Sequence, residues 1–195
     1  MGGELNAYTN KEELCLHASF RKVYFDRAAQ LLGDLVLNPI FPKDEIEKEK
    51  MVIFDEINSY LDAPTDRIMD EFEGHLFQDH SLGYNILGTE ESLSGLDQQD
   101  LIDFTTRHFT AENTVISVVG DVDIDYMKIV LEDSFGLMPV KSVDPYSSDF
   151  TKKMNKFDLL EKKANYQSHL LIGGYAPVEN AVDRKAVTLV MNYLG

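Results

Sequence analysis

The sequence has little cysteine, little positive charge and no long apolar run. Its single cysteine, Cys15, excludes an internal disulfide and suits a reducing compartment, so a cytoplasmic location is favoured. Lysine and arginine number 18 against 34 aspartates and glutamates, which gives a formal net charge of −16. This excess of acid disfavours a nucleic-acid partner or an anionic membrane surface. No apolar run approaches the ~20 residues that span a bilayer, and no signal peptide is visible at the N-terminus.

The hydrophobic pattern predicts an α+β fold, in which an antiparallel-rich sheet is covered by helices. Apolar and polar residues alternate over 4–9 and 13–20, which predicts two strands joined by a polar turn. Apolar residues at helical spacing predict a helix over 25–37, with Ala28, Leu31, Leu32, Leu35 and Val36 facing inward. Further helices are predicted from Thr65 to about 77, from Thr89, over 97–108, 125–135 and 180–194, and further strands over 114–120, 157–161 and 169–175.

The stretch 41–60, FPKDEIEKEKMVIFDEINSY, predicts the central helix. Pro42 suits the first turn of a helix, where a missing N–H costs nothing. Glu49 and Glu56 are seven residues apart, so they project within about 20° of each other. Both lie close to an apolar stripe formed by Ile46, Ile53, Phe54, Ile57 and Tyr60. Carboxylates beside a buried face are costly unless they are paired, protonated or bound to a metal. The simpler interpretation is an acidic helix whose glutamates lie at the edge of solvent.

Four sequence blocks together resemble one protein family. The blocks are GGELNAYTNKE (2–12), NPIFPKDEIEKEKMVIFDEINSY (38–60), LGYNILGTEESL (82–93) and the helix with ENTVISVVGDVD that ends at Asp123. In this order they are similar to the pitrilysin/insulysin/mitochondrial-processing-peptidase family of inverted zinc peptidases, and most similar to its bacterial, half-size members. The resemblance extends over essentially the whole chain.

The resemblance implies a zinc site. In this family an H-x-x-E-H helix supplies two histidine ligands and the general-base glutamate, and a glutamate on a later helix is the third ligand. The D-E-I at 55–57 matches that position, so Glu56 is the expected zinc ligand. Glu49 matches a second glutamate on the same helix face, which supports the site without binding the metal. Two histidines and one glutamate leave a fourth position on zinc for water.

The sequence departs from the family at the H-x-x-E-H motif, which none of its five histidines forms. We expect that motif before Met1, so the chain is interpreted as a fragment truncated at both ends, without a catalytic residue of its own. Taken alone, it should not bind catalytic zinc tightly or cleave peptides. The expected organisation is the remainder of a first, zinc-bearing repeat over 1–140, a linker over 141–155 and the start of a second repeat over 156–195.

The resemblance also implies a substrate strand. Asn6, Ala7 and Tyr8 match the edge strand to which a peptide adds as an extra β-strand in this family. The alternative is an ordinary edge or core strand.

Other candidate sites are weaker. His75, Asp79 and His80 could form a metal site, although they carry no recognised ligand spacing and a surface cluster is the default. His17 and His169 lie in predicted strands and are expected to be packed. Gly173-Gly174 is not followed by the pattern of a phosphate loop.

Three functions remain open at this point. The first is a zinc metalloendopeptidase that encloses peptides or unfolded polypeptides in a chamber and acts as a homodimer or with a homologous subunit. The second is a non-catalytic peptide-binding or scaffold subunit of the same family. The third is a generic acidic interaction domain. Retention of both Glu49 and Glu56 favours the enzyme, and the four ordered blocks disfavour the third function.

Overall fold

The computed structural model describes residues 2–141, 156–162, 167–174 and 181–194. The chain forms two compact units, one of residues 1–58 with 86–149 and the other of 59–85 with 150–195. Within the described residues, helices accompany one small antiparallel sheet, so the predicted α+β class is confirmed. The predicted linker 141–155 lies, apart from its first residue, outside the described residues. No described helix is long and apolar enough to cross a membrane.

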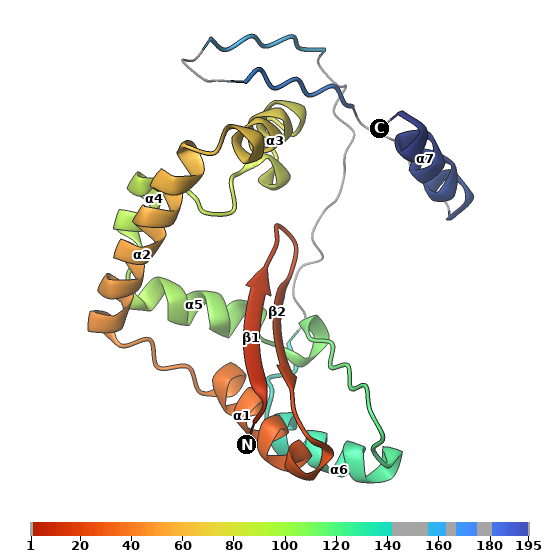
Figure 1. The fold of residues 1–195 in the computed structure, drawn as a ribbon. Coiled ribbons are helices and arrows are strands. Elements are labelled where there is room, and N and C mark those ends of the chain that lie inside the picture. Colours follow the sequence, from red (N-terminus) through yellow and green to blue (C-terminus); the bar gives the residue numbers. More distant parts are fainter. Residues whose placement is uncertain (1, 142–155, 163–166, 175–180, 195) are drawn as a thin grey trace. The chain divides into compact units, whose positions relative to one another are not determined.

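The first unit begins with a β-hairpin, as the alternating sequence predicts. Strands β1 (Glu4–Thr9) and β2 (Leu14–Ser19) pair antiparallel and are drawn in red in Figure 1. Asn10 closes the turn, because its side-chain Oδ1 accepts hydrogen bonds from the backbone N–H groups of Glu12 and Glu13 at 2.8 Å each. An asparagine side chain that mimics a backbone turn explains how this polar connection sets the pairing.

Helices make up most of the remaining regular structure of the described residues. They are η1 (Lys22–Tyr24), α1 (Phe25–Leu37), α2 (Lys43–Leu61), α3 (Pro64–Leu76), η2 (Ser81–Gly83), α4 (Glu90–Gly95), α5 (Gln98–His108), η3 (Ala111–Asn113), α6 (Ile124–Phe135) and α7 (Ala181–Leu194). The predicted starts at Thr89 and Asp97 are confirmed, because their side chains accept backbone hydrogen bonds at the beginning of α4 and α5. Helix α3 instead begins one residue before Thr65, with Pro64 in its first turn and Ala63 at the cap.

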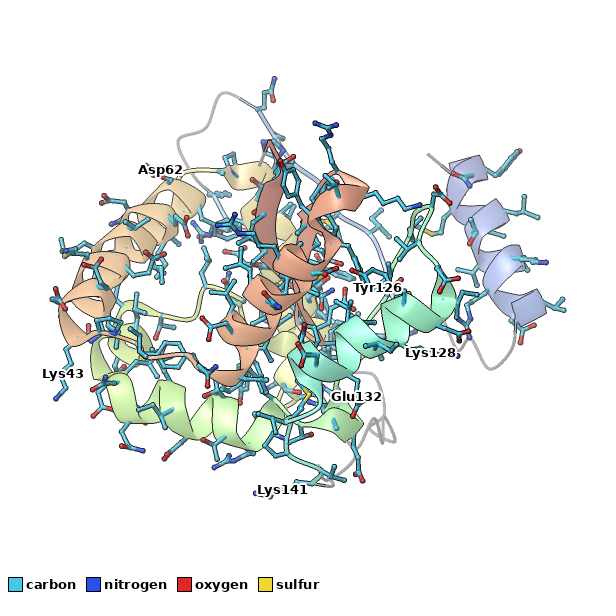
Figure 2. All side chains as sticks on the ribbon, turned by 90° about the horizontal axis from the view of Figure 1, so that it is seen from below. Lys43, Asp62, Tyr126, Lys128, Glu132 and Lys141 are labelled. Carbon is cyan, nitrogen blue, oxygen red and sulfur yellow. The ribbon has the colours of Figure 1, made fainter. Side chains whose placement is uncertain are left out.

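Helices α1 and α6 pack together to form the core of the first unit. Phe25, Ala29 and Val130 are its buried residues. A Cβ on Gly33 would overlap the backbone carbonyl oxygen of Ser134, so the two helices approach closely only because Gly33 has no side chain. Tyr126 extends from α6 toward α1 and donates a hydrogen bond to Asp26 (Figure 2).

The inward face predicted for α1 is partly wrong. Leu31 and Leu35 are exposed, whereas the buried face is the line of Phe25, Ala29 and Gly33. Residues four apart form one ridge of a helix. Ala29 and Gly33 are small residues on that ridge, so α6 can approach it closely. Helix α6 therefore packs on this ridge, and Leu31 and Leu35 stay exposed.

The three later strands predicted from the sequence do not appear as paired strands. Residues 114–119 form no strand and have no hydrogen-bonded partner strand within the described part of the chain, and Val115 and Val119 are 93% and 97% exposed. The described parts of 157–161 and 169–175 likewise form no strand of a sheet. Pattern alone predicts an extended segment, but a strand also needs a neighbour to satisfy its backbone groups.

In the second unit, the segment 156–162 lies on α3. The ring of Phe157 packs on the rings of Phe72 and His75, with centroids 5.3 Å apart in both pairs. Arg67 Nη2 lies 3.1 Å from both carboxylate oxygens of Glu161. Aromatic packing by Phe157 and the ion pair between Arg67 and Glu161 therefore hold this segment to α3.

Replacing Gly33 by alanine tests the close packing of α1 on α6. Alanine favours an isolated helix by about 1 kcal/mol over glycine, but the overlap with Ser134 should destabilise the protein by about 1–3 kcal/mol net. The measurement is the free energy of unfolding in urea. Gly95→Ala, in a helix with open space around the new methyl group, is the control and should not destabilise. A Gly33→Ala protein as stable as the parent would contradict the packing.

Candidate metal and peptide-binding site

Helix α2 carries both candidate zinc-site glutamates on one unbroken helix (Figure 2 labels Lys43 at its start and Asp62 just beyond its end). Its apolar stripe is confirmed, with Ile57 buried, but Glu49 and Glu56 are both exposed. Neither glutamate makes an ion pair or side-chain hydrogen bond with any residue that the structure describes.

Other α2 carboxylates are paired with lysines three residues on. Glu45 lies 2.6 Å from Lys48 and Glu47 lies 2.9 Å from Lys50. Lys50 is only 9% exposed, so its charge needs the partner that Glu47 supplies. The two lysines are thus engaged elsewhere, which leaves Glu49 and Glu56 available to an external ligand.

A metal would find only part of a site here. Among the described residues, no group of three histidine, cysteine, aspartate or glutamate side chains is arranged to hold a metal ion. Glu56 offers one hard oxygen donor, which suits a single ligand position on zinc. Glu56 therefore fits the third ligand position of the implied zinc site, and two more protein ligands are needed to complete that site.

Strand β1 has one edge without a partner strand in the described residues. All six of its residues are exposed, and within the described residues its only partner is β2 on the other edge. The backbone N–H of Ala7 donates to Asn6 Oδ1 at 2.8 Å. The Ala7 N–H therefore points away from β2 and takes no part in the β1–β2 ladder. The N–H and C=O of one residue point to the same side of a strand, so both groups of Ala7 face the open edge.

Tyr8 lies on the hairpin face that also carries Asn6, Cys15 and His17. Tyr8 is opposite Cys15 in the register, and its ring lies 6.2 Å from that of His17. Hydrogen bonding to the Cys15 thiol, with the nearby Glu13 carboxylate, raises the pKa of Tyr8. His17 is exposed on this face, so the prediction that it is packed was wrong. The opposite face, with Ala7, is apolar.

The histidines near the end of α3 serve the fold. His75 stacks on Phe157, and His80 Nδ1 accepts a hydrogen bond from the backbone N–H of Leu82 at the start of η2. The possible metal site at His75, Asp79 and His80 is not supported, since no three-ligand group is found in the part of the chain described.

One polar cluster escaped the sequence analysis. Tyr60 Oη lies 2.5 Å from Asp70 Oδ2 and 2.8 Å from the Asp66 carbonyl oxygen, and Asn85 Nδ2 donates to the same Asp70 oxygen at 2.5 Å. Burial, and then the Asp70 carboxylate, raise the pKa of Tyr60 well above its usual value. In the sequence Tyr60 was counted only as part of the apolar stripe, and the three residues have no spacing that reveals the cluster.

Comparison with known proteins identifies the family. The model "Insulinase (Peptidase family M16)" matches residues 1–90, and "Peptidase M16 inactive domain" matches residues 95–195. The chain belongs to the M16 peptidase family, which confirms the resemblance drawn from the four blocks.

Curated relatives carry zinc protease names. A protein named as an uncharacterized zinc protease of Mycobacterium leprae is 33% identical over the whole chain, which spans 44% of that protein. A protein named as the uncharacterized zinc protease YmxG of Bacillus subtilis is 34% identical over 89% of the chain and 42% of its own length. The chain thus spans less than half the length of these relatives. The mitochondrial-processing peptidase subunit beta of Blastocladiella emersonii is 30% identical over 71% of the chain and 30% of that subunit.

Solved structures share the fold. An M16-like peptidase from Alicyclobacillus acidocaldarius matches 73% of the chain and 33% of its own, at 24% identity and a TM-score of 0.64. A protease from Helicobacter pylori matches 80% of the chain and 36% of its own, at 18% identity and a TM-score of 0.65. These matches support the fold class.

The raised pKa of Tyr60 predicts a loss of stability in alkali. An unfolded tyrosine ionises near pH ~10, so Tyr60 stabilises the fold fully below that pH. As pH rises from there through the higher folded-state pKa, this contribution is lost. In Tyr60→Phe, the free energy of unfolding, measured in urea at increasing pH, should fall less steeply. Tyr84→Phe, at an exposed site, is the control, and equal slopes in Tyr60→Phe and the parent would contradict the prediction.

Proposed function

We propose that the chain is part of a zinc metalloendopeptidase that hydrolyses peptides or unfolded polypeptides in an enclosed chamber. Glu56 is the zinc ligand that this chain supplies, and Glu49 supports the site. Strand β1 binds the substrate through Asn6, Ala7 and Tyr8. The chain by itself, which has no H-x-x-E-H motif, is inactive.

The observation that carries the proposal is the state of the carboxylates on α2. Two glutamates lie two helical turns apart, exposed and without partners in the described residues, while their neighbours Glu45 and Glu47 pair with lysines. A carboxylate without an internal partner keeps its lone pairs free for a metal. Family membership and the zinc protease names of the relatives support zinc as that metal.

Each group of the chain has a separate role in this proposal. When bound, zinc would supply a Lewis acid that lowers the pKa of a water molecule. Glu56 would donate one carboxylate oxygen to the metal. Glu49, two turns earlier on α2, would orient the ligands through hydrogen bonds, as outer carboxylates do in metal sites.

The hairpin would hold the substrate by its backbone. A peptide that adds to β1 pairs with the outward N–H and C=O of Ala7, in place of the Asn6 side chain. Backbone pairing accepts many sequences, while Tyr8 and His17 on one face and apolar residues on the other would limit the side chains that fit.

The chain would act with a second, similar chain. Paired subunits are suggested by the mitochondrial-processing peptidase subunit among the relatives. The second candidate function is a non-catalytic peptide-binding or scaffold subunit of the same family, which keeps the peptide strand and lacks zinc. About one zinc per chain, by elemental analysis of the protein at the full length of its relatives, would favour the enzyme. No zinc would favour the non-catalytic subunit.

Glu56→Gln tests the ligand assignment in the protein at the full length of its relatives. Glutamine keeps the size of the side chain but lacks the negative charge, so zinc content and peptide hydrolysis should be lost together. Glu49→Gln should weaken both by a smaller factor, about 10–100-fold.

Asp55→Asn is the matched control for these variants. Asp55 is an exposed carboxylate next to Glu56 on the same helix, so its neutralisation should leave zinc content unchanged. If Glu56→Gln retained its zinc, the ligand assignment would be wrong.

Ala7→Pro tests peptide addition to β1. Proline removes the outward N–H of residue 7 and leaves the hydrogen bonds between β1 and β2 in place. Edge strands tolerate proline at such positions. Peptide affinity, measured by fluorescence anisotropy with a labelled unfolded peptide, should fall about 2–12-fold, the equivalent of one lost hydrogen bond. Ala7→Ser keeps the N–H and should bind as the parent does. Equal binding by Ala7→Pro would sink the β-addition model.

A further inference from the structure

The side chains of Tyr60, Asp70 and Asn85 form a hydrogen-bonded cluster, here called the Tyr60 clamp. Each comes from a different segment: Tyr60 from the last turn of α2, Asp70 from the middle of α3 and Asn85 from the loop after η2. Both hydrogen bonds to Asp70 meet at its Oδ2 atom at 2.5 Å, and all three side chains are half-buried. The clamp therefore joins three segments of the second unit through one carboxylate oxygen.

The clamp holds the end of α2 more firmly than the backbone alone. A hydrogen bond to a carboxylate is roughly twice as strong as a neutral one. The Tyr60 hydroxyl oxygen also lies 2.8 Å from the backbone carbonyl oxygen of Asp66. The backbone carbonyl of Tyr60 accepts a hydrogen bond from the backbone N–H of Ala63 at 3.0 Å. The last carbonyls of a helix otherwise lack partners, and helix ends fray where nothing holds them.

Glu56 lies one helical turn before Tyr60. Because α2 runs unbroken from Lys43 to Leu61, whatever fixes the rotation of the helix at Tyr60 also fixes the direction of the side chain one turn earlier. The buried Ile57 holds one side of α2 beside Glu56, but the Glu56 side chain itself is exposed and has no partner in the described residues. A metal ligand, however, must be held within about 0.5 Å of its working position.

We propose that the Tyr60 clamp is a positioning device for Glu56, which orients its carboxylate for metal binding. Tyr60, Asp70 and Asn85 would be positioning residues that act through α2 and touch neither metal nor substrate. This inference rests on the proposed role of Glu56 as a zinc ligand.

The test is Tyr60→Phe in the protein at the full length of its relatives. The substitution removes the hydroxyl and keeps the ring that fills the apolar stripe. The zinc dissociation constant, measured by competition with a chromophoric chelator, should rise about 10–100-fold, as it does when outer partners of metal ligands are lost. The kcat for peptide hydrolysis at saturating zinc should fall, while KM stays as in the parent, because β1 is untouched.

Two further variants keep the result decisive. Asn85→Ala removes one hydrogen bond to Asp70 and should weaken zinc binding less than Tyr60→Phe does. This variant still tests the proposal if Tyr60→Phe folds poorly. Tyr84→Phe, at an exposed tyrosine that is 71% accessible, is the matched control and should leave zinc affinity unchanged.

The outcomes separate this inference from the proposed function. If Glu56→Gln loses zinc but both clamp variants bind zinc as the parent does, even with lower melting temperatures, the clamp is only a structural joint and the inference is overturned. If Glu56→Gln itself retains zinc, the ligand assignment fails, and a clamp effect on zinc affinity could not act through Glu56. Loss of zinc affinity in both Tyr60→Phe and Glu56→Gln supports the positioning role.

Discussion

The first unit depends on the close contact of α1 with the backbone of α6 at Gly33. This approach brings Phe25, Ala29 and Val130 together as the core. Phe20, at the end of β2, packs its ring 6.3 Å from that of Phe25, so the hairpin is seated on the same core by one end. All of β1 remains exposed, which is the condition for an open strand edge.

Local signals predicted the local structure well. The alternation over 4–9 and 13–20, the caps at Thr89 and Asp97, and the helical spacing of α1 are all properties of neighbouring residues. Each appears in the structure, with the second strand at 14–19. The unpaired segment 114–119 and the buried face of α1 could not be predicted in this way. A strand needs a partner from elsewhere in the chain, and Gly33 faces inward because α6 is opposite it.

In the candidate site, too, features set by neighbouring residues were predicted, whereas features set by distant residues were not. Glu49 and Glu56 followed from helical spacing and from the resemblance, and the structure adds that both are exposed, whereas spacing alone placed them beside the buried face. Their role as ligands stays a prediction. The Tyr60 clamp was missed because its members are 10 and 15 residues apart, in segments whose meeting only the fold decides. The phenol hydroxyl was a signal in itself, since a half-buried tyrosine usually finds a partner for it.

The contact between Asn6 and its neighbour Ala7 has a consequence for solubility. An open strand edge is a template on which other copies of a protein can stack and aggregate. Asn6 Oδ1 occupies the outward N–H of Ala7 from within the same strand. The Asn6 side chain thus caps one outward donor of this edge, which makes the edge a poorer template for a second copy of the chain.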